Sequence, residues 1–518
     1  MVRRKSLING GIVVSLFAVA FVSVPSLRAQ GPTGTQTQVT QPIQLPLSGR
    51  PAQNGSVSAT ESPVPGTTTS VNTINANIQV QSPYSGSIPG FASRPFSGKL
   101  SFREAIERGL VYNLGEVGLL QAVNQAQGQA RVSRSALLPN LTGDLQETVQ
   151  QTNLKALGVH FQAPGFSIPT IVGPFNYIDL RARLSQNVID LTALNNYKAA
   201  KESSRAAQLS AQDARDLVVL AVGGTYLQVI AAKARVQSAH AQLDTANALY
   251  DQAAQQRKAG VLAQVDADRS QVQALTQQQR LFSLENDFAK QKIDLARMTG
   301  LPPNDQYEIT DDIPFAATLV PSVEEALRQA FDQRSDVKAA QAQIRAAERA
   351  MAAARAQRLP SLAINGDYGV IGTNPSQSHG TFSVTGTLRF SIWEGGRIEG
   401  DIEQARAGFT QRQAEYEDLR LQIESEVRKA FLDMQTAANQ VSVAQKNREV
   451  AKETLDLTRQ KVEAGVAESV ELVQTQESLA SADLDYINSV FAHNLAKLSL
   501  ARALGRTADV LPSFVNLK

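Results

Sequence analysis

Several residue types are scarce in this chain of 518 residues, and each scarcity excludes a class of protein. Cysteine is absent, which excludes disulfides, thiolate metal sites and a lipid-modified N-terminal cysteine. The four histidines, at positions 160, 240, 379 and 493, lie too far apart in the sequence to form a local zinc motif. Lys and Arg number 50 and Asp and Glu number 48, so no charge excess indicates nucleic acid as a partner.

Aromatic residues make up only 6% of the chain, which is low for one compact core and favours long helices packed in thin layers. The sequence has no serine with a motif-placed histidine, no histidine pair at helical spacing and no glycine-rich phosphate loop after a strand. The carboxylate pairs Asp311-Asp312 and Glu324-Glu325 are interpreted as solvated residues of a linker or a helix start. We therefore expect neither an enzyme nor a bound cofactor or metal.

The N-terminal region has two parts of different composition. Residues 1–29 are typical of a signal peptide, because a positive segment at 3–5 precedes an apolar run at 12–24 and small residues up to Ala29. A membrane anchor is the alternative, but the run is shorter than the ~18 apolar residues that a spanning helix needs. Residues 30–96 are rich in Pro, Gly, Ser, Thr, Gln and Asn, which predicts a disordered extension.

The rest of the chain is an internal duplication. Leu138-Pro139-Asn140-Leu141 recurs 221 residues later as Leu359-Pro360-Ser361-Leu362, and Ala259-Gly260-Val261 recurs 205 residues later as Ala464-Gly465-Val466. The difference between the offsets predicts about sixteen extra residues in the first copy, which we assign to a loop within 152–177. These matches define a first repeat (97–300), a linker (301–320), a second repeat (321–506) and a C-terminal tail (507–518).

Each repeat has the same predicted order of elements. A helical stretch, 100–137 or 321–357, ends at Leu-Pro, because proline cannot continue a helix. Two strands of about ten residues follow, each with one apolar and one polar face. The apolar face of the last strand consists of Phe382, Val384, Leu388 and Phe390, and the polar positions of the strands include Arg181, Arg183, Thr387 and Arg389. The strand from Leu141 alternates poorly and is the weakest strand prediction.

A very long helix, a glycine-containing break and a second helix complete each repeat. In the first copy the long helix is predicted from Leu191 to Lys258, a length of roughly 100 Å at 1.5 Å per residue. Its apolar stripe repeats every seven residues, which indicates coiled-coil packing. The stripe consists of Val222, Val229, Val236, Leu243 and Tyr250.

Four strands of this length match tilted membrane strands, but four strands cannot close a barrel. An open sheet edge is not tolerated in lipid, so the chain must assemble with other copies of itself. A dimer would supply eight strands and little lumen, and a trimer would supply twelve strands and a pore. The alternative is a soluble exported protein whose hairpins pack on its own helices.

The duplicated order of elements over residues 100–505 resembles the TolC-type outer membrane efflux family. Two junction motifs, Leu184–Asp190 and Phe390–Arg397, support the resemblance. It implies a mainly α protein with membrane β, in which a trimeric twelve-stranded outer membrane barrel continues as a helical periplasmic tunnel. It also implies a passive duct for tripartite efflux or type I secretion, with a periplasmic adaptor and an inner-membrane pump of the RND, ABC or MFS type as partners. The alternative function is a structural coiled-coil protein of the cell envelope without transport.

The resemblance also assigns site residues. The turns Ala259-Gly260-Val261 and Ala464-Gly465-Val466 match the periplasmic tip that meets the adaptor, and Arg181, Arg183 and Arg389 would face the lumen. Asp266 and Glu471, each six residues past a turn glycine, match acids that constrict the periplasmic entrance. Threefold symmetry would turn them into carboxylate rings that favour cations. The alternative is that both are solvated acids at helix starts.

The sequence departs from the family at its gate. Gln474 stands where TolC has a second acid. Val462 and Ala467 stand where TolC has a latch tyrosine and a latch arginine. A different closing contact, formed by Arg257 or Lys258, is therefore expected. The cargo is left open among drugs, metals and proteins, although the few methionines disfavour copper and silver.

Overall fold

A computed structural model describes residues 57–64, 73–91, 95–156, 158, 162–163, 166–167, 169–304, 306–312, 322–464, 466, 469–505 and 507. All of them belong to one compact unit, Gln41–Lys518. The predicted signal peptide, 1–29, and nearly all of the predicted tail, 507–518, lie outside the described residues.

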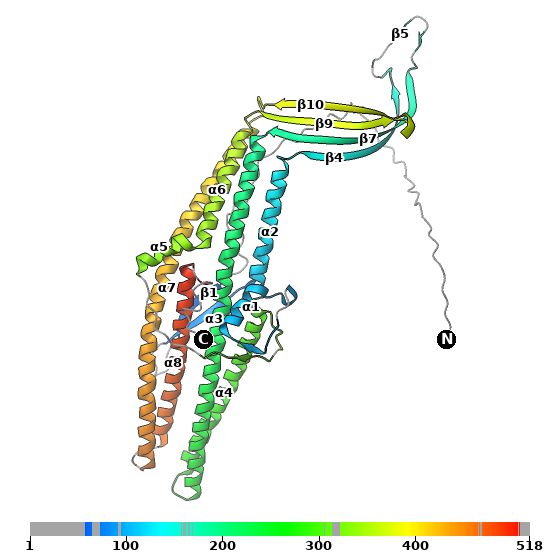
Figure 1. Ribbon diagram of the computed structural model, residues 1–518. Coiled ribbons are helices and arrows are strands. Elements are labelled where there is room, and N and C mark those ends of the chain that lie inside the picture. The colour runs from blue at the N-terminus through cyan, green and yellow to red at the C-terminus, as the bar shows by residue number, and fades with distance from the viewer. Residues whose placement is uncertain are drawn as a thin grey trace, which may run out of the picture. The chain divides into compact units, whose positions relative to one another are not determined.

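The helices repeat with the two offsets found in the sequence (Figure 1). The first copy contains α1 (Phe102–Tyr112), α2 (Leu114–Ser135), α3 (Leu191–Lys258) and α4 (Gln264–Thr299). The second copy contains α5 (Val323–Gln333), α6 (Ser335–Ala356), α7 (Arg397–Glu463) and α8 (Ser469–Ala503). The bounds of α5 and α6 follow those of α1 and α2 by 221 residues, and α3 has the bounds predicted for it. The duplicated, mainly helical fold is therefore confirmed.

The two stretches predicted as single helices are each broken into two. The breaks fall at Asn113 and Arg334, whose backbones are extended with ψ near 130°. In both repeats the first short helix starts with a serine cap. The hydroxyl of Ser101 accepts from the amide of Glu104 at 3.2 Å, and that of Ser322 accepts from the amide of Glu325 at 3.3 Å.

Four long strands form one antiparallel sheet in the order β10-β9-β7-β4, which lies at the end of α2, α3, α6 and α7 (Figure 1). The strands are β4 (Asn140–Asn153), β7 (Ile171–Ile189), β9 (Ser361–Gly372) and β10 (His379–Arg389). The expected length of about ten residues is wrong for the first repeat, whose strands have 14 and 19 residues. The loop expected within 152–177 is shorter than predicted, because β7 begins at Ile171.

The weakest strand prediction also needs correction. β4 pairs along most of its length with β7, and this register places Leu141, Leu145 and Val149 on the same face as Leu180 and Leu184. Glycine and glutamate at the intervening face positions concealed this alternation in the sequence. β4 is thus a two-faced strand like the other three.

Alanine accounts for much of the helix packing. On α3 four alanines spaced by seven residues, 232, 239, 246 and 253, are all buried, and on α4 the buried Ala267, Ala274 and Leu281 keep the same spacing. Small side chains let the two helices approach closely, which explains how a chain poor in aromatics builds long packed helices. One window of α3 is apolar enough to cross a membrane, but 78% of it is buried within the protein, as in a core helix.

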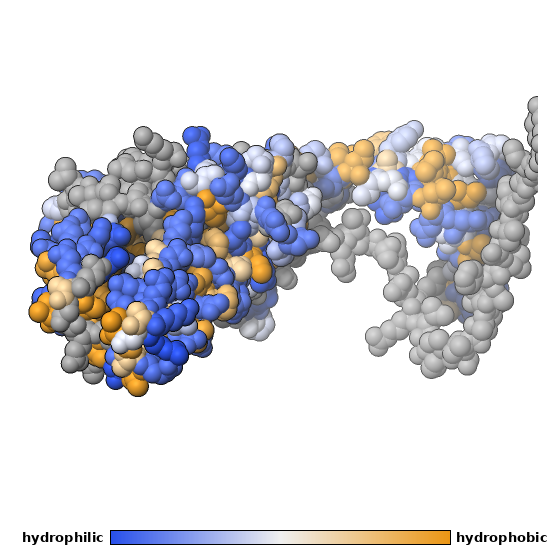
Figure 2. Space-filling model, turned by 90° about the horizontal axis from the view of Figure 1, so that it is seen from below, coloured by the Kyte–Doolittle hydropathy of each residue, from blue (hydrophilic) through white to orange (hydrophobic). Residues whose placement is uncertain are grey.

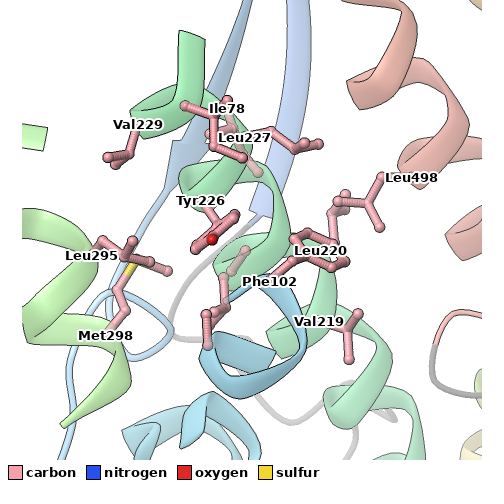
Figure 3. Close-up of a cluster of buried hydrophobic side chains, with 14 of the residues drawn as sticks. Ile78, Phe102, Val219, Leu220, Tyr226, Leu227, Val229, Leu295, Met298 and Leu498 are labelled. Carbon is pink, nitrogen blue, oxygen red and sulfur yellow. The ribbon is translucent and has the colours of Figure 1, made fainter. Parts of the chain in front are cut away.

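The main apolar core lies where α1, α3, α4 and α8 meet (Figure 3). Tyr226 of α3 is fully buried there and packs edge-on against Phe102 of α1, with ring centroids 5.5 Å apart. The linker contributes Asp311, whose carboxylate accepts from the amide of Phe102 at 2.7 Å and from the hydroxyl of Tyr226 at 2.8 Å. Asp311, which we expected to be solvated, therefore anchors the start of α1 to α3.

The prediction that residues 30–96 are disordered is wrong for the part that the structure describes. β1 (Val57–Val64) and β2 (Thr73–Val80) form an antiparallel hairpin, and Pro89–Phe91 forms a 3₁₀ turn. Ala76, Ile78 and Tyr84 belong to the main core. A composition poor in charge and apolar residues concealed a few well-placed apolar side chains, which pack on a surface supplied by the helices.

The remaining elements are short. β3 (Lys99–Leu100) pairs in parallel with β8 (Glu308–Ile309), β5 (Gln162–Ala163) pairs with β6 (Phe166–Ser167), and a 3₁₀ turn spans Pro375–Gln377. The β3–β8 pair joins the start of the first repeat to the residues after α4, so the beginning of the predicted linker is folded into the core region.

Candidate functional site

One face of the four-stranded sheet is polar along its whole width. Because cross-strand partners share a face, the pairs Thr381–Gly369, Arg181–Gly369 and Asp144–Arg181 place one residue of each strand in a single row. The charged residues of this face are Asp144, Asp179, Arg181, Arg183, Asp367 and Arg389. Three are acids and three are arginines, so their formal charges cancel.

Arg181 is the centre of a side-chain network on this face. Its guanidinium forms an ion pair with Asp367 on β9, and Nε donates to Asp179 on its own strand at 3.3 Å. Nη2 also reaches the hydroxyl of Thr381 on β10, at 3.4 Å. Gly369 lies between these strands, and a Cβ there would stand 2.8 Å from a backbone oxygen of β7 and 3.0 Å from the Cβ of Arg181. Glycine therefore lets the arginine lie across β9 and brace three strands.

A second arginine makes a similar cross-strand pair. Nη1 of Arg183 lies 3.2 Å from a carboxylate oxygen of Asp144 on β4. Arg389, at the end of β10, lies on the same face. All three arginines predicted to face the lumen thus lie on one side of the sheet, and two of them have carboxylate partners that span neighbouring strands.

The opposite face is apolar and exposed. Figure 2 shows patches of hydrophobic residues beside hydrophilic ones in the part of the molecule that carries the sheet. The most exposed apolar residues on this face are Leu141 (72%), Leu145 (73%), Val149 (69%), Phe382 (77%) and Val384 (72%). Glu147 is a charged exception on this face of β4. Beyond β10, Ile392 and Trp393 are exposed by 89% and 85%, in the connection that leads to α7.

The two connections from strand to long helix differ between the repeats. In the first repeat the carboxylate of Asp190 caps α3 by accepting from the amide of Ala193 at 2.8 Å. In the second repeat Gly395 and Gly396 have φ of +63° and +85° before α7 begins. The glycine pair gives the backbone the bend that leads from sheet to helix.

The turns at the far end of the helices are tight and expose their valines. At the end of α3 the amide of Val261 donates to the carbonyl of Gln256 at 3.0 Å, and Gly260 has φ +78°. The equivalent bond from Val466 to Lys461, also 3.0 Å, ends α7. Both patterns are those of a Schellman cap, although Gly465 itself lies outside the described residues. Val261 and Val466 are 75% and 77% exposed, so each turn presents one apolar side chain.

The predicted gate residues stand at the starts of α4 and α8. Asp266 and Glu471 both lie in the first turn of their helix, a position that the helix dipole favours for acids. Nη1 of Arg269 lies 3.1 Å from Oδ1 of Asp266. Glu471 and Gln474 are exposed. Asp266 lines a cavity between the two hairpins that neither Glu471 nor Gln474 lines, so the structure of one chain does not group the three residues.

That cavity has a volume of about 660 Å³ and holds residues that the sequence did not single out. Arg269 and Arg459 both line it, whereas Arg257 and Lys258, which we expected near a closing contact, are exposed. The spacing of three residues between Asp266 and Arg269 on one helix could have indicated their pairing. Among the residues that the structure describes, no group of three or more histidines, aspartates or glutamates could hold a metal.

The sequence matches the family described as outer membrane efflux protein over residues 119–301 and 326–506. These two matches cover most of both repeats, so the chain belongs to the outer membrane efflux protein family. Proteins of this family are channels that work in efflux systems with adaptor proteins and inner-membrane pumps.

Curated relatives and solved structures agree with this assignment. The pyoverdine export outer membrane protein OpmQ of Pseudomonas putida is 24% identical over 397 residues, which cover 74% of this chain and 81% of OpmQ. Outer membrane protein OprJ of Pseudomonas aeruginosa is 24% identical over 429 residues, 78% of this chain and 83% of OprJ. The crystal structure of the outer membrane protein VceC of Vibrio cholerae is similar with a TM-score of 0.67 and 19% identity, over 78% of this chain and 96% of VceC.

The protein is therefore an outer membrane efflux channel protein. Its four-stranded sheet is the membrane part, and its long helices are the periplasmic part. The resemblance to TolC-type channels, the mainly helical, duplicated fold class and the outer membrane location predicted from the sequence are confirmed.

Proposed function

We propose that three copies of the chain close one channel, through which small molecules delivered by an inner-membrane pump leave the cell passively. One observation carries this proposal. A single copy has unpaired edge strands in its sheet and exposed apolar residues on its outer helices, and both are suited to contact with a second copy.

The sheet edges make the first argument. In the part of the chain that the structure describes, β4 and β10 each have one neighbouring strand in the long sheet. Unpaired backbone groups at a sheet edge cost several kcal/mol each in lipid, so membrane sheets close into barrels. Four strands per copy give twelve strands for three copies, a number that leaves a lumen.

The helix edges make the second argument. α3 packs against α4 and α8, and α8 packs against α7, so α4 and α7 are the outer helices. α7 carries a stripe of exposed apolar residues at spacings of 11, 11, 7 and 7: Leu421, Leu432, Val443, Val450 and Leu457. At 100° per residue these lie within about 40° of each other, on the side opposite the buried Val427, Met434 and Val441.

α4 also carries exposed apolar residues, which spread over about 100° of its surface: Val265, Val272, Leu275, Phe282 and Ile293, all at least 47% exposed. An exposed apolar stripe tens of ångströms long is unusual on a monomer and indicates a protein partner. Because α4 and α7 are the two outer helices of one copy, α7 of one copy can pack on α4 of the next, and repetition of this head-to-tail contact would close a ring.

We assign the two faces of the sheet accordingly. The apolar face with Phe382 and Val384 meets lipid, and the polar face with Arg181, Arg183 and Arg389 lines the lumen. Exposed Trp393 would lie at the membrane–water interface, where amphipathic rings are enriched. Since the charges of the polar face cancel, the barrel should conduct with little preference for one sign of charge.

The periplasmic end is assigned to gating and docking. Asp266 and Glu471, with Gln474 nearby, would form the acidic ring that narrows the entrance, and cations would be favoured there. The turns Ala259-Gly260-Val261 and Ala464-Gly465-Val466 would dock the adaptor, and the exposed Val261 and Val466 support an apolar contact. The pump would be of the RND, ABC or MFS type. The relative named for pyoverdine export supports a small molecule as cargo.

The chain offers a clean test of the assembly, because it has no native cysteine. Val443 lies about twenty residues from the end of α7, and Phe282 lies about as far from the start of α4. A double variant, Val443→Cys with Phe282→Cys, should form disulfide-linked species up to a trimer, and the detergent-extracted protein should have the mass of three chains.

The matched control pairs Val443→Cys with Glu285→Cys, which lies on the face of α4 that meets His240 of α3. It should give far less intermolecular linkage. A monodisperse water-soluble monomer, or equal linkage in both variants, would contradict the proposed ring.

A further inference from the structure

The segment Ala76–Ile88, which we name the strap, lies in the region that composition suggested to be disordered. In its strand portion Ala76 and Ile78 are 5% and 7% exposed, whereas the alternating Asn77 and Gln79 are exposed. The strand therefore has one buried face. This face packs against α3 of the first repeat and α8 of the second.

The first contact of the strap is the packing of Ile78 against Gly224 of α3. A Cβ added at Gly224 would lie 2.2 Å from Cδ1 of Ile78 and 3.3 Å from Cδ1 of Leu495 on α8. Figure 3 shows Ile78 beside the part of α3 that carries Tyr226 and Leu227. Glycine thus creates the space in which Ile78 closes the seam between α3 and α8, the two helices that join the repeats.

The second contact of the strap is the packing of Tyr84 against Gly115 of α2. A Cβ at Gly115 would lie 2.4 Å from Cδ1 of Tyr84, a residue that is 5% exposed. Nδ2 of Asn113 donates to the carbonyl of Tyr84 at 2.6 Å. The strap is therefore held by a buried side chain and by a buried polar contact at the α1–α2 break.

Backbone hydrogen bonds continue this attachment. The amide of Ile88 donates to the carbonyl of Tyr112 at 2.8 Å, and the amide of Leu114 donates to the carbonyl of Gly86 at 2.9 Å. The hydroxyl of Ser87 donates to the carbonyl of Arg297 on α4. The carbonyl of Tyr112 and the amide of Leu114, which lie at the helix break, thus find their hydrogen-bond partners in the strap.

We propose that the strap is an intramolecular clamp that holds the α3/α4 hairpin and the α7/α8 hairpin together at the level of α1. Farther toward the turns, cavities of about 420 and 660 Å³ lie between the same two hairpins. The clamp is therefore a fixed point from which the two hairpins diverge. It holds the two repeats together from the N-terminal side of the first repeat.

The test uses the mutual fit of two side-chain positions in the full-length protein. Ile78→Ala should leave a void over Gly224, and Gly224→Ala should force its Cβ into Ile78. Each single variant should speed hydrogen exchange of the α8 amides in Val490–Leu498 by roughly tenfold or more, because the seam opens more often. In the double variant the alanine at 224 occupies the space that Ile78 has left. Its hydrogen exchange should therefore be slower than the rate obtained by multiplying the increases of the two single variants.

Two comparisons make the test decisive. Asn77→Ala, on the exposed face of the same strand, should leave exchange unchanged. Tyr84→Ala with Gly115→Ala forms a second cycle at the α1–α2 break, which is read in the amides of α2 and stays informative if the first cycle does not fold. The clamp would be overturned if the exchange rates of both double variants equalled the product of the single-variant effects. It would also be overturned if Ile78→Ala changed exchange no more than Asn77→Ala does. Channel formation is not part of the readout, so failure of the proposed function would not affect it.

Discussion

The two repeats break their first helical stretch at equivalent positions but stabilise the break with different chemistry. At Asn113 a neutral amide accepts from the amide of Gly115 at 2.9 Å and donates to the carbonyl of Tyr84. At Arg334 a buried guanidinium donates to the carbonyl of Ala503 at 3.3 Å, and it pairs with acids on α6 and α7.

The comparison shows which features of the helix break the two repeats share. In each repeat the residue at the break donates a side-chain hydrogen bond to a distant backbone carbonyl. The acceptor is the carbonyl of Tyr84 for Asn113 and the carbonyl of Ala503 for Arg334. A buried carbonyl needs a donor, but a neutral amide and a guanidinium can both supply it. The geometry of the break is therefore shared, whereas the cost of losing its side chain should differ.

The largest effect is expected at the charged break. Arg334→Met would remove the buried guanidinium that pairs with Asp336 and Glu426. Loss of one partner of a buried pair costs about 3–5 kcal/mol, and because these acids are 19% and 39% exposed we expect a loss at the lower end of this range. Chemical unfolding of the detergent-extracted protein should show this loss. Arg328→Met, at a side chain that is 77% exposed, should change stability by less than about 1 kcal/mol. Equal losses in the two variants would refute a structural role for the buried guanidinium.

The sheet of the second repeat tests the assignment of its faces. Val384→Arg would place a charge on the apolar face at a cost of about 2–4 kcal/mol at mid-membrane, whereas Thr385→Arg would place it on the polar face at little cost. Folding yield into lipid bilayers would compare the two variants. Similar yields would mean that the faces are assigned the wrong way or that the sheet is not in lipid.

A smaller loss is expected at the neutral break. Asn113→Ala would remove the cap of α2 and leave the carbonyl of Tyr84 without this donor, a cost of about 1–3 kcal/mol. Asn124→Ala, at an exposed position of the same helix, serves as the control in the same unfolding experiment. If Asn113→Ala cost as much as Arg334→Met, the difference in chemistry between the two breaks would have no energetic meaning.

The residues three positions beyond the two breaks should differ in how their contribution to folding stability depends on pH. Burial raises the pKa of Glu116 from 4.5 to about 7, although the charge of Arg215, 3.6 Å away, opposes the shift. Its counterpart in the second repeat is Val337, which is 2% exposed. Because folded Glu116 binds more protons than unfolded Glu116 between these values, its contribution to stability falls as pH rises through this window.

Replacing the acid with its counterpart should remove that pH dependence. Glu116→Val should be more stable than the parent by about 1–2 kcal/mol at pH 8, and the difference should shrink toward pH 4.5. Melting curves across this pH range would measure it. A pH-independent difference would show that the carboxyl group does not titrate with a raised pKa.

The helices were predictable from the sequence because their signals are local. Heptad spacing, the Leu-Pro stops and the repeated offsets placed α3 at its observed bounds. The break at Asn113 was not predictable, because Asn113 is not a strong helix breaker and its extended backbone depends on a carbonyl from the strap. The strap was missed for a related reason: Ile78 and Tyr84 are stabilised by Gly224 and Gly115, which are distant in sequence.

The candidate site was predictable only in part. Alternation placed Arg181 and Arg183 on the polar face, because a period of two is visible in the sequence. The pairing of Arg181 with Asp367 required the register between β7 and β9, which links the two repeats. The position of Asp266 and Glu471 in first helical turns followed from the turn glycines, whereas their role depends on symmetry that one chain does not contain.

The most direct measurement is single-channel recording of the wild type and of the double variant Asp266→Asn with Glu471→Gln. In a trimer this variant removes six negative charges, one acid from each repeat of each chain, from the periplasmic entrance. We expect the wild type to conduct with a cation preference and with block by multivalent cations. The double variant should assemble normally and lose much of both, and added salt should reduce the difference. Unaltered selectivity and block in the double variant would contradict the acidic ring, and absence of any conductance in the wild type would contradict the channel itself.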